Sequence, residues 1–489
     1  MDIKMKVSSS GIPTTFDANL LNELQNSKPD EFLNYVDLTD ELIVTMDGES
    51  AKDFDDAFMV KKIADEKFLL GVYIADVSRY VKPNTLVDQE ALRRSFSCYL
   101  PNQVIPMLPN LLSDDLCSLL PNELRYTIAC HMIINGGIIK EVEVFPALIK
   151  SKYRLVYEEV NDWFKKEVVP IGLSMLLDAK ELALILENKR HDAGSLDFVT
   201  IESQITLDEQ GRAINVDAVH RGIAEAMIEE FMIACNKSIA ERIAYLDLPF
   251  LYRVHDEPNG MKLSEVRMIA SELGIVIPKK QNSIHPLFIQ QILEKPTTDE
   301  EKAIFNNLIL RAMAKAKYQE YNIGHFGLAL KNYTHFTSPI RRYPDLLVHR
   351  LIKQYLFGEE LYQIDAIPSL LSEATCIVNQ NERIIENLER DVDDMKKAEY
   401  MSTKIGKSYS GIISGIQKWG LYVQLNNCIE GMIASRELAM DDYYFDELHQ
   451  DYSNLKGDKL KLGQSIMIEV FDADKERGTI DFILKTKGE

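Results

Sequence analysis

A short acidic segment near the start of this chain places the tightest limit on how it can fold. Residues 46–58 read MDGESAKDFDDAF and hold four aspartates within ten positions: Asp47, Asp53, Asp55 and Asp56. Apolar residues lie between and beside them, so the fold must bury part of this segment while it brings the carboxylates together. Carboxylates within a few ångströms of one another cannot all stay ionised unless a positive group lies between them.

Four carboxylates at this spacing indicate a hard divalent cation. Oxygen donors suit Mg²⁺ or Mn²⁺, whereas zinc would favour Cys or His. Two such ions about 3.5–4 Å apart would stabilise the attacking and leaving oxygens of a phosphodiester during in-line attack. The alternatives are a Ca²⁺-binding or Asx-rich turn and the charged edge of a strand. An EF-hand is disfavoured, because no Glu follows Asp47 at the twelfth loop position and helical flanks are missing.

The distribution of charge qualifies the acidic total. The 489-residue chain carries a net charge of -21, which by itself argues against a nucleic-acid partner, since such proteins usually show a basic footprint. Residues 301–350 nevertheless hold eight Lys or Arg and three acids, a local balance of +5. A basic stretch inside an acidic chain predicts a narrow positive channel that suits a threaded single strand.

Cysteine usage and hydropathy bear on the compartment. The six cysteines form no CxxC pair, so neither a zinc knuckle nor a disulfide framework is indicated, and we expect buried thiols in a reducing compartment. The N-terminus shows no charged-then-apolar leader, and no apolar run reaches the roughly 18 residues of a membrane span. We therefore expect a cytoplasmic monomer without membrane contact.

Hydrophobic periodicity divides the chain into a lead-in of residues 1–40, a catalytic region of residues 41–402 and a C-terminal domain of residues 403–489. In the catalytic region we expect strands over 41–46 and 68–77, and helices with buried stripes at 223–243, 305–316, from 344 onward and 377–398. Residues 99–120 are rich in proline and apolar residues, and are predicted to form a long ordered loop of functional importance.

The pattern changes at about residue 403. Glycine recurs, and in the string LYVQL Leu421, Val423 and Leu425 alternate with Tyr422 and Gln424. Five short strand candidates in about 85 residues predict a small antiparallel barrel of the OB class. Three exposed positions are its candidates for stacking on bases or meeting phosphates: Lys418, Trp419 and Tyr422.

The string HFTSPIRRYPDLLVHR, residues 335–350, is the second informative segment. Arg341 and Arg342 precede a helix start marked by Pro344, so guanidinium donors and free backbone N–H groups could converge on one phosphate. Two solvated arginines before a helix are the alternative. His335 and His349 lack an identifying partner, and neither is assigned a role.

Taken together, these strings resemble the RNase II/RNase R family of processive exoribonucleases, the RNB family. The acidic string, the proline-rich loop from Tyr99, the arginine string and the later LERDVDD resemble four ordered family motifs, and the match runs from about residue 11 to the C-terminus. The closing barrel resembles the family's S1-type RNA-binding domain. The resemblance implies an α+β fold: an RNB catalytic domain with a mixed sheet and long helices around an RNA channel, followed by an S1-type OB barrel.

The resemblance also implies Mg²⁺-dependent hydrolysis of single-stranded RNA from the 3′ end, processively, to nucleoside 5′-monophosphates, with Mn²⁺ as a possible substitute. By position, the four aspartates match the family's metal-binding acids, and Asp55 matches the one most needed for chemistry. Arg341 matches the arginine that steadies the scissile phosphate. Further RNA contacts are implied at these positions: Tyr99, Tyr157, Phe198, Glu230, Arg342 and Glu389.

One departure from the family pattern is large. Family members normally carry cold-shock OB domains before the catalytic domain, and here SSSGIPTTF resembles only the tail of the second one. This leaves open how RNA is selected and whether duplexes are excluded. Two rival readings are a catalytically idle RNA-binding protein with the same fold and a DNA-directed nuclease. The intact set of four aspartates and Arg341 disfavours the first, and activity on a deoxy strand would favour the second.

Overall fold

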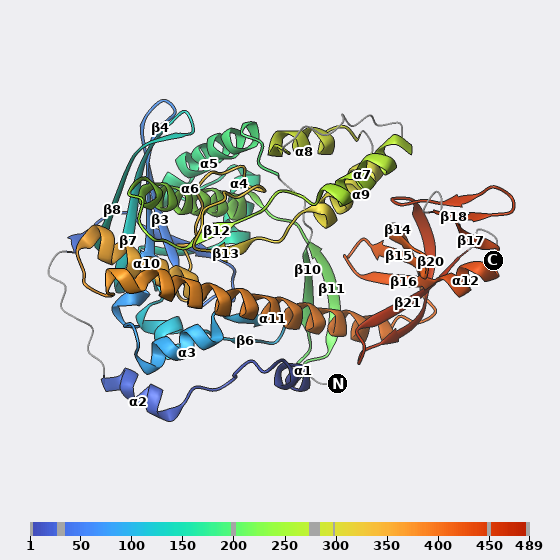
Figure 1. Ribbon diagram of the computed structural model, residues 1–489, viewed down its shortest axis with the longest axis horizontal. Coiled ribbons are helices and arrows are strands. Elements are labelled where there is room, and N and C mark those ends of the chain that lie inside the picture. The colour runs from blue at the N-terminus through green and yellow to red at the C-terminus, as the bar shows by residue number, and fades with distance from the viewer. Residues whose placement is uncertain are drawn as a thin grey trace.

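The chain has a large α+β body and a smaller β-barrel, joined by one long helix (Figure 1). The computed structural model describes residues 3–26, 35–196, 202–272, 284–296, 299–446 and 451–485. The joining helix, α11 (Ile367–Ser402), runs along the body and contacts barrel strands at its end. The predicted fold class, a mixed sheet with long helices followed by a barrel, is confirmed.

The body is built on a mixed seven-stranded sheet. Its inner neighbours are antiparallel, and its two outermost pairs are parallel. The predicted strand at 68–77 is the buried central β4. In spatial order the strands are β1 (Val36–Asp37), β8 (Ile138–Lys150), β7 (Leu124–Asn135), β4 (Lys67–Ala75), β3 (Asp56–Ala64), β2 (Val44–Asp47) and β9 (Tyr153–Val156).

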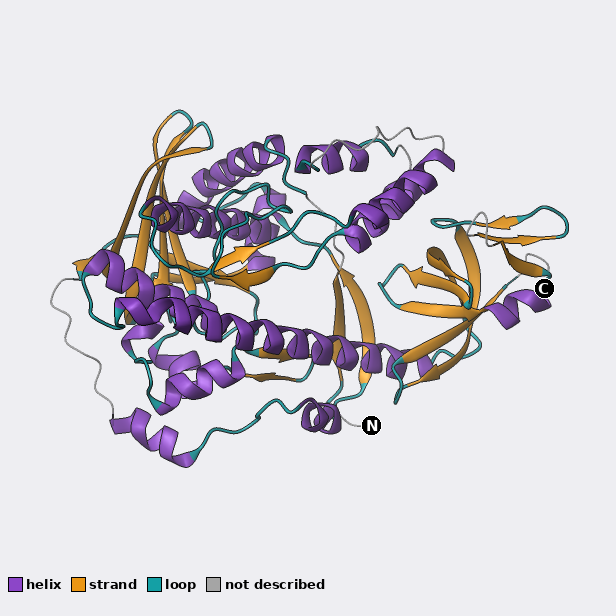
Figure 2. Cartoon of the chain, in the orientation of Figure 1, coloured by secondary structure: helices purple, strands orange, loops and turns teal. Residues whose placement is uncertain are grey.

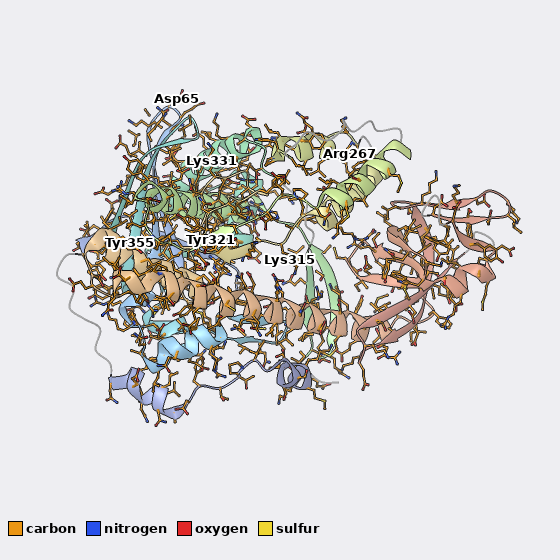
Figure 3. All side chains as sticks on the ribbon, viewed as in Figure 1. Asp65, Arg267, Lys315, Tyr321, Lys331 and Tyr355 are labelled. Atoms are coloured by element: carbon orange, nitrogen blue, oxygen red, sulfur yellow. The ribbon has the colours of Figure 1, made fainter. Side chains whose placement is uncertain are left out.

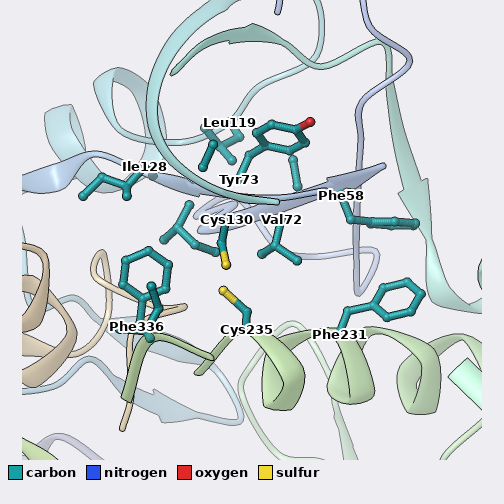
Figure 4. Packing of buried hydrophobic residues seen from close by; sticks show 14 of the residues in the cluster. Phe58, Val72, Tyr73, Leu119, Ile128, Cys130, Phe231, Cys235 and Phe336 are labelled. Atoms are coloured by element: carbon teal, nitrogen blue, oxygen red, sulfur yellow. The ribbon is translucent and has the colours of Figure 1, made fainter. Parts of the chain in front are cut away.

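Two helices, α5 (Met175–Asp192) and α6 (Ile223–Tyr245), pack on this sheet. The predicted apolar stripe of α6 is buried from Met227 to Ile243, whereas its first member, Ile223, is exposed. Figure 4 shows the contact: the side chains of Cys235 and Phe231 point from the helix toward the sheet. The Phe231 ring lies 5.5 Å from that of Phe58. Helix α6 is therefore held in a fixed rotation, which decides which of its side chains face the site.

The other predicted helices form with shifted ends. The helix expected from residue 344 is α10 (Tyr343–Phe357), with Arg342 as its N-cap, and the segment expected at 377–398 lies inside the longer α11. The stripe at 305–316 belongs to α9 (Asp299–Ala312), which ends before Ala316. Helix α9 packs with α7 (Gly260–Glu272) and α8 (Pro286–Leu293).

The proline-rich segment at 99–120 is more regular than predicted. It contains part of a short hairpin, β5 (Cys98–Leu100) with β6 (Gln103–Ile105), and a helical turn at Leu111–Leu116. The hairpin joins the small core between α11 and α1 (Ile3–Ser10). The remaining elements of the body are α2 (Ala18–Asn26), α3 (Leu86–Arg94), α4 (Tyr157–Lys166), β10 (Glu202–Leu207), β11 (Ala213–Val219), β12 (Tyr252–Val254) and β13 (Lys317–Gln319).

The C-terminal strands close into a barrel (Figure 2). Leu421, Val423 and Leu425 are buried inside it while Tyr422 and Gln424 face outward, as the alternation predicts. One seam, β16 with β21, is parallel, so the expected all-antiparallel barrel is wrong there. Its strands are β14 (Ser408–Gln417), β15 (Gly420–Leu425), β16 (Glu430–Ala434), β21 (Thr479–Leu484) and β20 (Ser465–Asp474).

Helix α12 (Ser435–Met440) and a small three-stranded sheet, β17 (Tyr443–Asp446), β18 (Asp451–Asn454) and β19 (Lys459–Leu460), flank the barrel. Among the described residues of the whole chain, no helix combines the length and the apolar character that a membrane crossing needs.

Candidate active site

One cavity of about 580 Å³ collects most of the predicted catalytic residues. It lies between the β2–β3 edge of the sheet, one face of α6 and the loop before α10. Residues far apart in the sequence meet here, as the acidic and arginine strings together predict. Its lining includes Asp47, Asp53, Asp55, Asp56, Tyr99, Tyr157, Arg341 and Arg342.

The antiparallel pairing of β2 with β3 brings the aspartates together. Asp47 ends β2 and Asp56 begins β3, so the loop between them returns the chain to the same edge of the sheet. The proline-rich segment supports this loop from behind. The Phe54 N–H donates to Ser118 Oγ at 3.1 Å, and the Leu119 N–H donates to the Phe54 carbonyl at 3.0 Å.

Asp55 is the most constrained of the four acids. It is 3% exposed, and its Oδ1 accepts a hydrogen bond from the Ile340 N–H at 2.7 Å. Its Oδ2 lies 3.4 Å from Arg341 Nε but accepts no hydrogen bond from any described residue. Burial raises the pKa of the Asp55 carboxyl well above its usual range, and the Arg341 charge only partly offsets this. A buried carboxylate oxygen without a donor is a free ligand position.

Asp47 and Asp56 share this unfavourable environment. Burial raises the pKa of Asp47, although its Oδ1 accepts the Gly48 N–H at 2.7 Å. Burial, together with the neighbouring charge of Asp47, raises the pKa of Asp56 to about 7. Arg341 acts in the opposite direction on both groups. These carboxylates therefore lack sufficient positive partners in the protein itself.

The donor set fits a hard cation better than any other group. Six carboxylates line the cavity, the four aspartates with Glu225 and Glu229, against two arginines. In the described part of the chain no three His, Cys, Asp or Glu side chains already converge as a metal site. Asp53 Oδ2, for example, accepts the Tyr99 hydroxyl at 2.8 Å. Binding of Mg²⁺ would thus need the carboxylates to turn toward one another, with Asp55 Oδ2 already available.

The two neighbouring arginines are not equivalent. The Arg341 side chain is 46% exposed and opens into the cavity beside Asp55. The Arg342 guanidinium instead forms a bidentate pair with the buried Asp345, at 3.0 and 2.8 Å. The prediction that both guanidinium groups are free for phosphate is wrong for Arg342, because Asp345 in the first turn of α10 engages it.

The backbone N–H groups before α10 are also engaged. Those of Arg341 and Arg342 donate to the Ser338 carbonyl, and that of Tyr343 donates to the Ser95 carbonyl at 2.8 Å. The predicted convergence of free backbone donors on a phosphate is therefore wrong for these residues. Together with the Ile340–Asp55 bond, these hydrogen bonds fix the loop that carries Arg341 against the acidic segment.

Tyr99 and Glu389 form one unit at the cavity mouth. The Tyr99 ring is 41% exposed, and its backbone N–H donates to Glu389 Oε1 at 2.7 Å. Glu389 on α11 therefore holds strand β5 rather than presenting a free carboxylate, and burial raises its pKa. Tyr157, the first residue of α4, lines the same cavity. The predicted base-contacting residue Phe198 lies outside the described residues.

Glu230 does not line this cavity. It is 3% exposed and forms an ion pair with Arg190 on α5, at 2.6 Å. Successive helical residues differ by about 100°, so Glu225 and Glu229 lie on the cavity face of α6 and Glu230 is turned away. Glu230 thus lies away from the aspartates, and its contact with RNA stays a prediction. The four-residue spacing of Glu225 and Glu229 shows that they share one face of α6, but it does not show that this face lines the cavity.

Several basic side chains of residues 301–350 form ion pairs, which their local charge balance does not predict. Lys315 pairs with Glu386, Lys317 with Asp256 and Arg350 with Asp88, all within 2.9 Å. These acids lie outside residues 301–350, so the local balance of +5 overstates the positive potential of a channel.

On the barrel, Trp419 is 57% exposed and its Nε1–H donates to Tyr422 Oη at 3.1 Å, next to Lys418.

Comparison with known families and structures gives a consistent result. Residues 35–358 match the family described as "RNB domain", and residues 402–485 match "S1 RNA binding domain". Ribonuclease R of Thermotoga maritima is 41% identical over 93% of this chain and 65% of its own length. Ribonuclease R of Ureaplasma parvum is 38% identical over 99% of this chain and 70% of its own. The chain thus spans about two thirds of these relatives.

Among solved structures, the chain is similar to Mycoplasma genitalium RNase R in complex with ribose methylated single-stranded RNA. The TM-score is 0.92 and the identity 31%, over 99% of this chain and 77% of that one. The likeness covers both the body and the barrel. It supports the arrangement of the two as one fold.

Proposed function

The chain belongs to the RNB family, and from this membership we propose that it is an exoribonuclease that hydrolyses single-stranded RNA from its 3′ end. Its similarity to the ribonuclease R proteins supports the activity and the substrate class. The observation that carries the proposal is local. Asp55 places a buried carboxylate oxygen without a hydrogen-bond donor beside the exposed Arg341 guanidinium, in a cavity lined by carboxylates.

We propose that Mg²⁺, or Mn²⁺ in its place, is held by Asp47, Asp53, Asp55 and Asp56. When bound, the cation would supply an activated water and charge stabilisation for a phosphodiester under attack. Its binding would also offset the burial and the neighbouring carboxylate charges that raise the pKa values of Asp55 and Asp56.

Arg341 is suited to orient the scissile phosphate. Its guanidinium carries several donors in a planar fork that matches phosphate oxygens. Its backbone is fixed by the bond between Ser338 and Arg341 and by the neighbouring Ile340–Asp55 bond. The donors therefore stay in place while negative charge develops on the phosphate, and they need little reorganisation.

Aromatic side chains would hold the bases. Tyr99 stands half-exposed at the cavity, fixed at both its hydroxyl and its backbone N–H, and can serve as a stacking platform. Trp419 and Tyr422 offer a second platform on the barrel. We propose that the strand is threaded, processed without release and cut to nucleoside 5′-monophosphates by a monomer in the cytoplasm.

A labelled-strand assay tests this function. Single-stranded RNA labelled at its 3′ end should release labelled mononucleotide from the first turnover with Mg²⁺, and none with EDTA. The Asp55→Asn protein should release none. The matched control is Asp65→Asn, because Asp65 is an exposed aspartate at the tip of the β3–β4 hairpin (Figure 3) and does not line the cavity. It should behave as the wild type.

Four outcomes would overturn parts of the proposal. Internal cuts would contradict an exonuclease, and equal activity of Asp55→Asn would contradict the assigned chemistry. Tight RNA binding without Mg²⁺-dependent turnover would identify an idle RNA-binding protein. Comparable degradation of a deoxy strand would identify a nuclease that does not require ribose.

A further inference from the structure

An uncharged polar group also lines the cavity, and the activity described above does not use it. It consists of Asn236 on α6 with Tyr333, His335, Thr337 and Ser338 from the loop before α10. Asn236 Oδ1 accepts the Phe336 N–H at 2.9 Å, so the helix holds this loop in place. Within the group, His335 combines a titratable side chain with a place on the cavity wall.

The orientation of the His335 ring is fixed from behind. Its Nδ1 lies 2.7 Å from the hydroxyl of Tyr318, a residue on β13 that is 2% exposed. Asn379 of α11 hydrogen-bonds both the N–H and the carbonyl of Tyr318, each at 2.8 Å. The rings of Tyr318 and Tyr333 meet the imidazole edge-on, with centroids 5.5 and 5.7 Å away. The ring cannot turn without breaking these contacts.

This arrangement selects one tautomer. Burial raises the pKa of the Tyr318 hydroxyl, so it stays protonated. Among the described residues that hydroxyl has no acceptor other than His335 Nδ1. A buried hydroxyl is rarely left without an acceptor, so Tyr318 donates and Nδ1 accepts. The ring proton then lies on Nε2, the ring nitrogen that does not face the Tyr318 hydroxyl.

The imidazole is also kept uncharged. Burial lowers the pKa of His335 well below its usual range, and the positive charges of Arg342 and Arg253 lower it further. Arg253 lies 4.5 Å over the Tyr318 ring and pairs with Glu382 at 2.8 Å. The cavity therefore presents two kinds of donor, the charged guanidinium of Arg341 and a neutral N–H of His335.

The geometry points to a specific role: His335 Nε2–H donates a hydrogen bond to a ribose 2′-hydroxyl of the strand in the cavity and so positions it. This inference rests on the proposed function. A charged donor suits a phosphate, and Arg341 already supplies one, whereas a neutral donor suits a neutral oxygen. A donor aimed at base edges would favour some bases over others, because their acceptor patterns differ. A 2′-hydroxyl is present in every ribonucleotide and absent from DNA.

A scan of single 2′-deoxy substitutions tests the inference. RNAs that carry one deoxynucleotide at each of the last several positions are degraded by the wild type, by His335→Ala and by His335→Gln. The wild type should lose about tenfold in kcat/KM at one position, the value of one hydrogen bond. His335→Ala should be slower on all-ribose RNA by a similar factor and indifferent to deoxy substitution at that position. Gln, whose amide nitrogen can reach the place of Nε2, should restore part of the sensitivity.

The controls separate this role from a structural one. His191→Ala removes a half-exposed histidine on α5 that does not line the cavity, and should leave the deoxy profile unchanged. Tyr318→Phe removes the group that fixes the tautomer, and should weaken the deoxy sensitivity without abolishing turnover. Should His335→Ala not fold, the Gln and Phe variants still decide the question.

Two results would overturn the inference. One is equal deoxy sensitivity of wild type and His335→Ala at every position; the other is a change in base preference without a change in deoxy sensitivity. Affinities of the same strands for an Asp55→Asn protein, with and without His335→Ala, give an independent readout. If the wild type cleaves no RNA, the proposed function fails, and these affinities still test the contact of His335.

Discussion

Two aspartates next to neighbouring strands of this sheet behave in opposite ways. Asp56 begins β3, and Asp76 follows the neighbouring β4, whose Ile74 is paired with Asp56 in the sheet register. Burial works against ionisation in both. Asp76 has Lys353 Nζ at 2.7 Å and accepts from Ser78 and Tyr35, and its pKa falls to about 2. Asp56 lacks such partners, and its pKa rises to about 7.

The difference distinguishes carboxylates that pair with cations of the protein from carboxylates that are available to bind a ligand. Asp76, Asp88 and Asp345 each have a cation of the protein within 2.8 Å, and the pairs of Asp76 and Asp88 connect α10 to the rest of the body. Among the described residues, the cavity aspartates have one cation within 4 Å, Arg341, which lies 3.4 Å from Asp55. The fold thus compensates the charge of these three acids more fully than that of the cavity aspartates, and the incomplete compensation in the cavity lowers stability. Such a destabilising arrangement of charges is typical of a ligand-binding site.

The largest effect is expected from Asp55→Asn. Turnover of RNA should fall by about three orders of magnitude or more, since one preorganised group at the reacting phosphate is commonly worth that much. The free energy of unfolding in EDTA should stay the same or increase, because the change removes a buried charge whose Oδ2 accepts no hydrogen bond from any described residue. Parallel activity assays and urea melts measure both. A protein that is both inactive and strongly destabilised would place Asp55 with the structural acids.

Asp76→Asn should show the reverse pattern. Removing one partner of a buried ion pair leaves Lys353 with the more distant Glu359, at 4.0 Å, and should cost about 3–5 kcal/mol of unfolding free energy. The fraction that remains folded at low temperature should retain the wild-type kcat. Loss of less than about 1 kcal/mol would show that the Asp76–Lys353 pair does not stabilise the fold as its geometry indicates.

The two arginines extend the same comparison. Arg341→Lys should lower kcat about a hundredfold, because an ammonium cannot reproduce the planar donor fork, and should leave stability nearly unchanged. Arg342→Lys should lower the unfolding free energy by about 1–3 kcal/mol through the lost bidentate bonds to Asp345. Steady-state kinetics and denaturant melts of both variants give the answer. Equal kinetic losses would contradict the inequivalence of the two side chains.

The smallest effect is the pH dependence of stability in the absence of divalent cations. The folded pKa of Asp76 is lowered from 3.8 to about 2, so its contribution is complete above pH 3.8 and is lost as the pH falls toward 2, by roughly 2 kcal/mol. The folded pKa of Asp56 is raised to about 7, so stability is instead lost as the pH rises from 3.8 through 7. In Asp56→Asn, the unfolding free energy from denaturant melts should depend less on pH between pH 4 and 8. An unchanged dependence of the unfolding free energy on pH would contradict the raised pKa of Asp56.

The sequence predicts those features of the site that local rules determine. Asp47 and Asp56 meet because two short strands around an acidic loop must pair, and the barrel alternation at Leu421 and Tyr422 follows from the period of two. The Arg342–Asp345 pair was also visible, as opposite charges three residues apart at a helix start.

Other features depend on tertiary packing that no local pattern encodes. The rotation of α6 is set by the contact of Phe231 with the sheet, so the choice between Glu229 and Glu230 could not be made from periodicity alone. The role of Glu389 depends on strand β5, which lies 290 positions earlier in the chain. The parallel seam of β16 and β21 likewise joins segments that the sequence separates.

Binding of Mn²⁺ measured by calorimetry tests the central claim most directly, namely that the unpaired cavity carboxylates form a cation site. The titration is done near pH 8, where Asp56 is ionised, on the wild type, Asp55→Asn and the exposed control Asp65→Asn. The wild type and Asp65→Asn should bind with the same affinity, and Asp55→Asn should bind at least about tenfold more weakly. Equal affinity in all three proteins, or binding in none, would contradict the account.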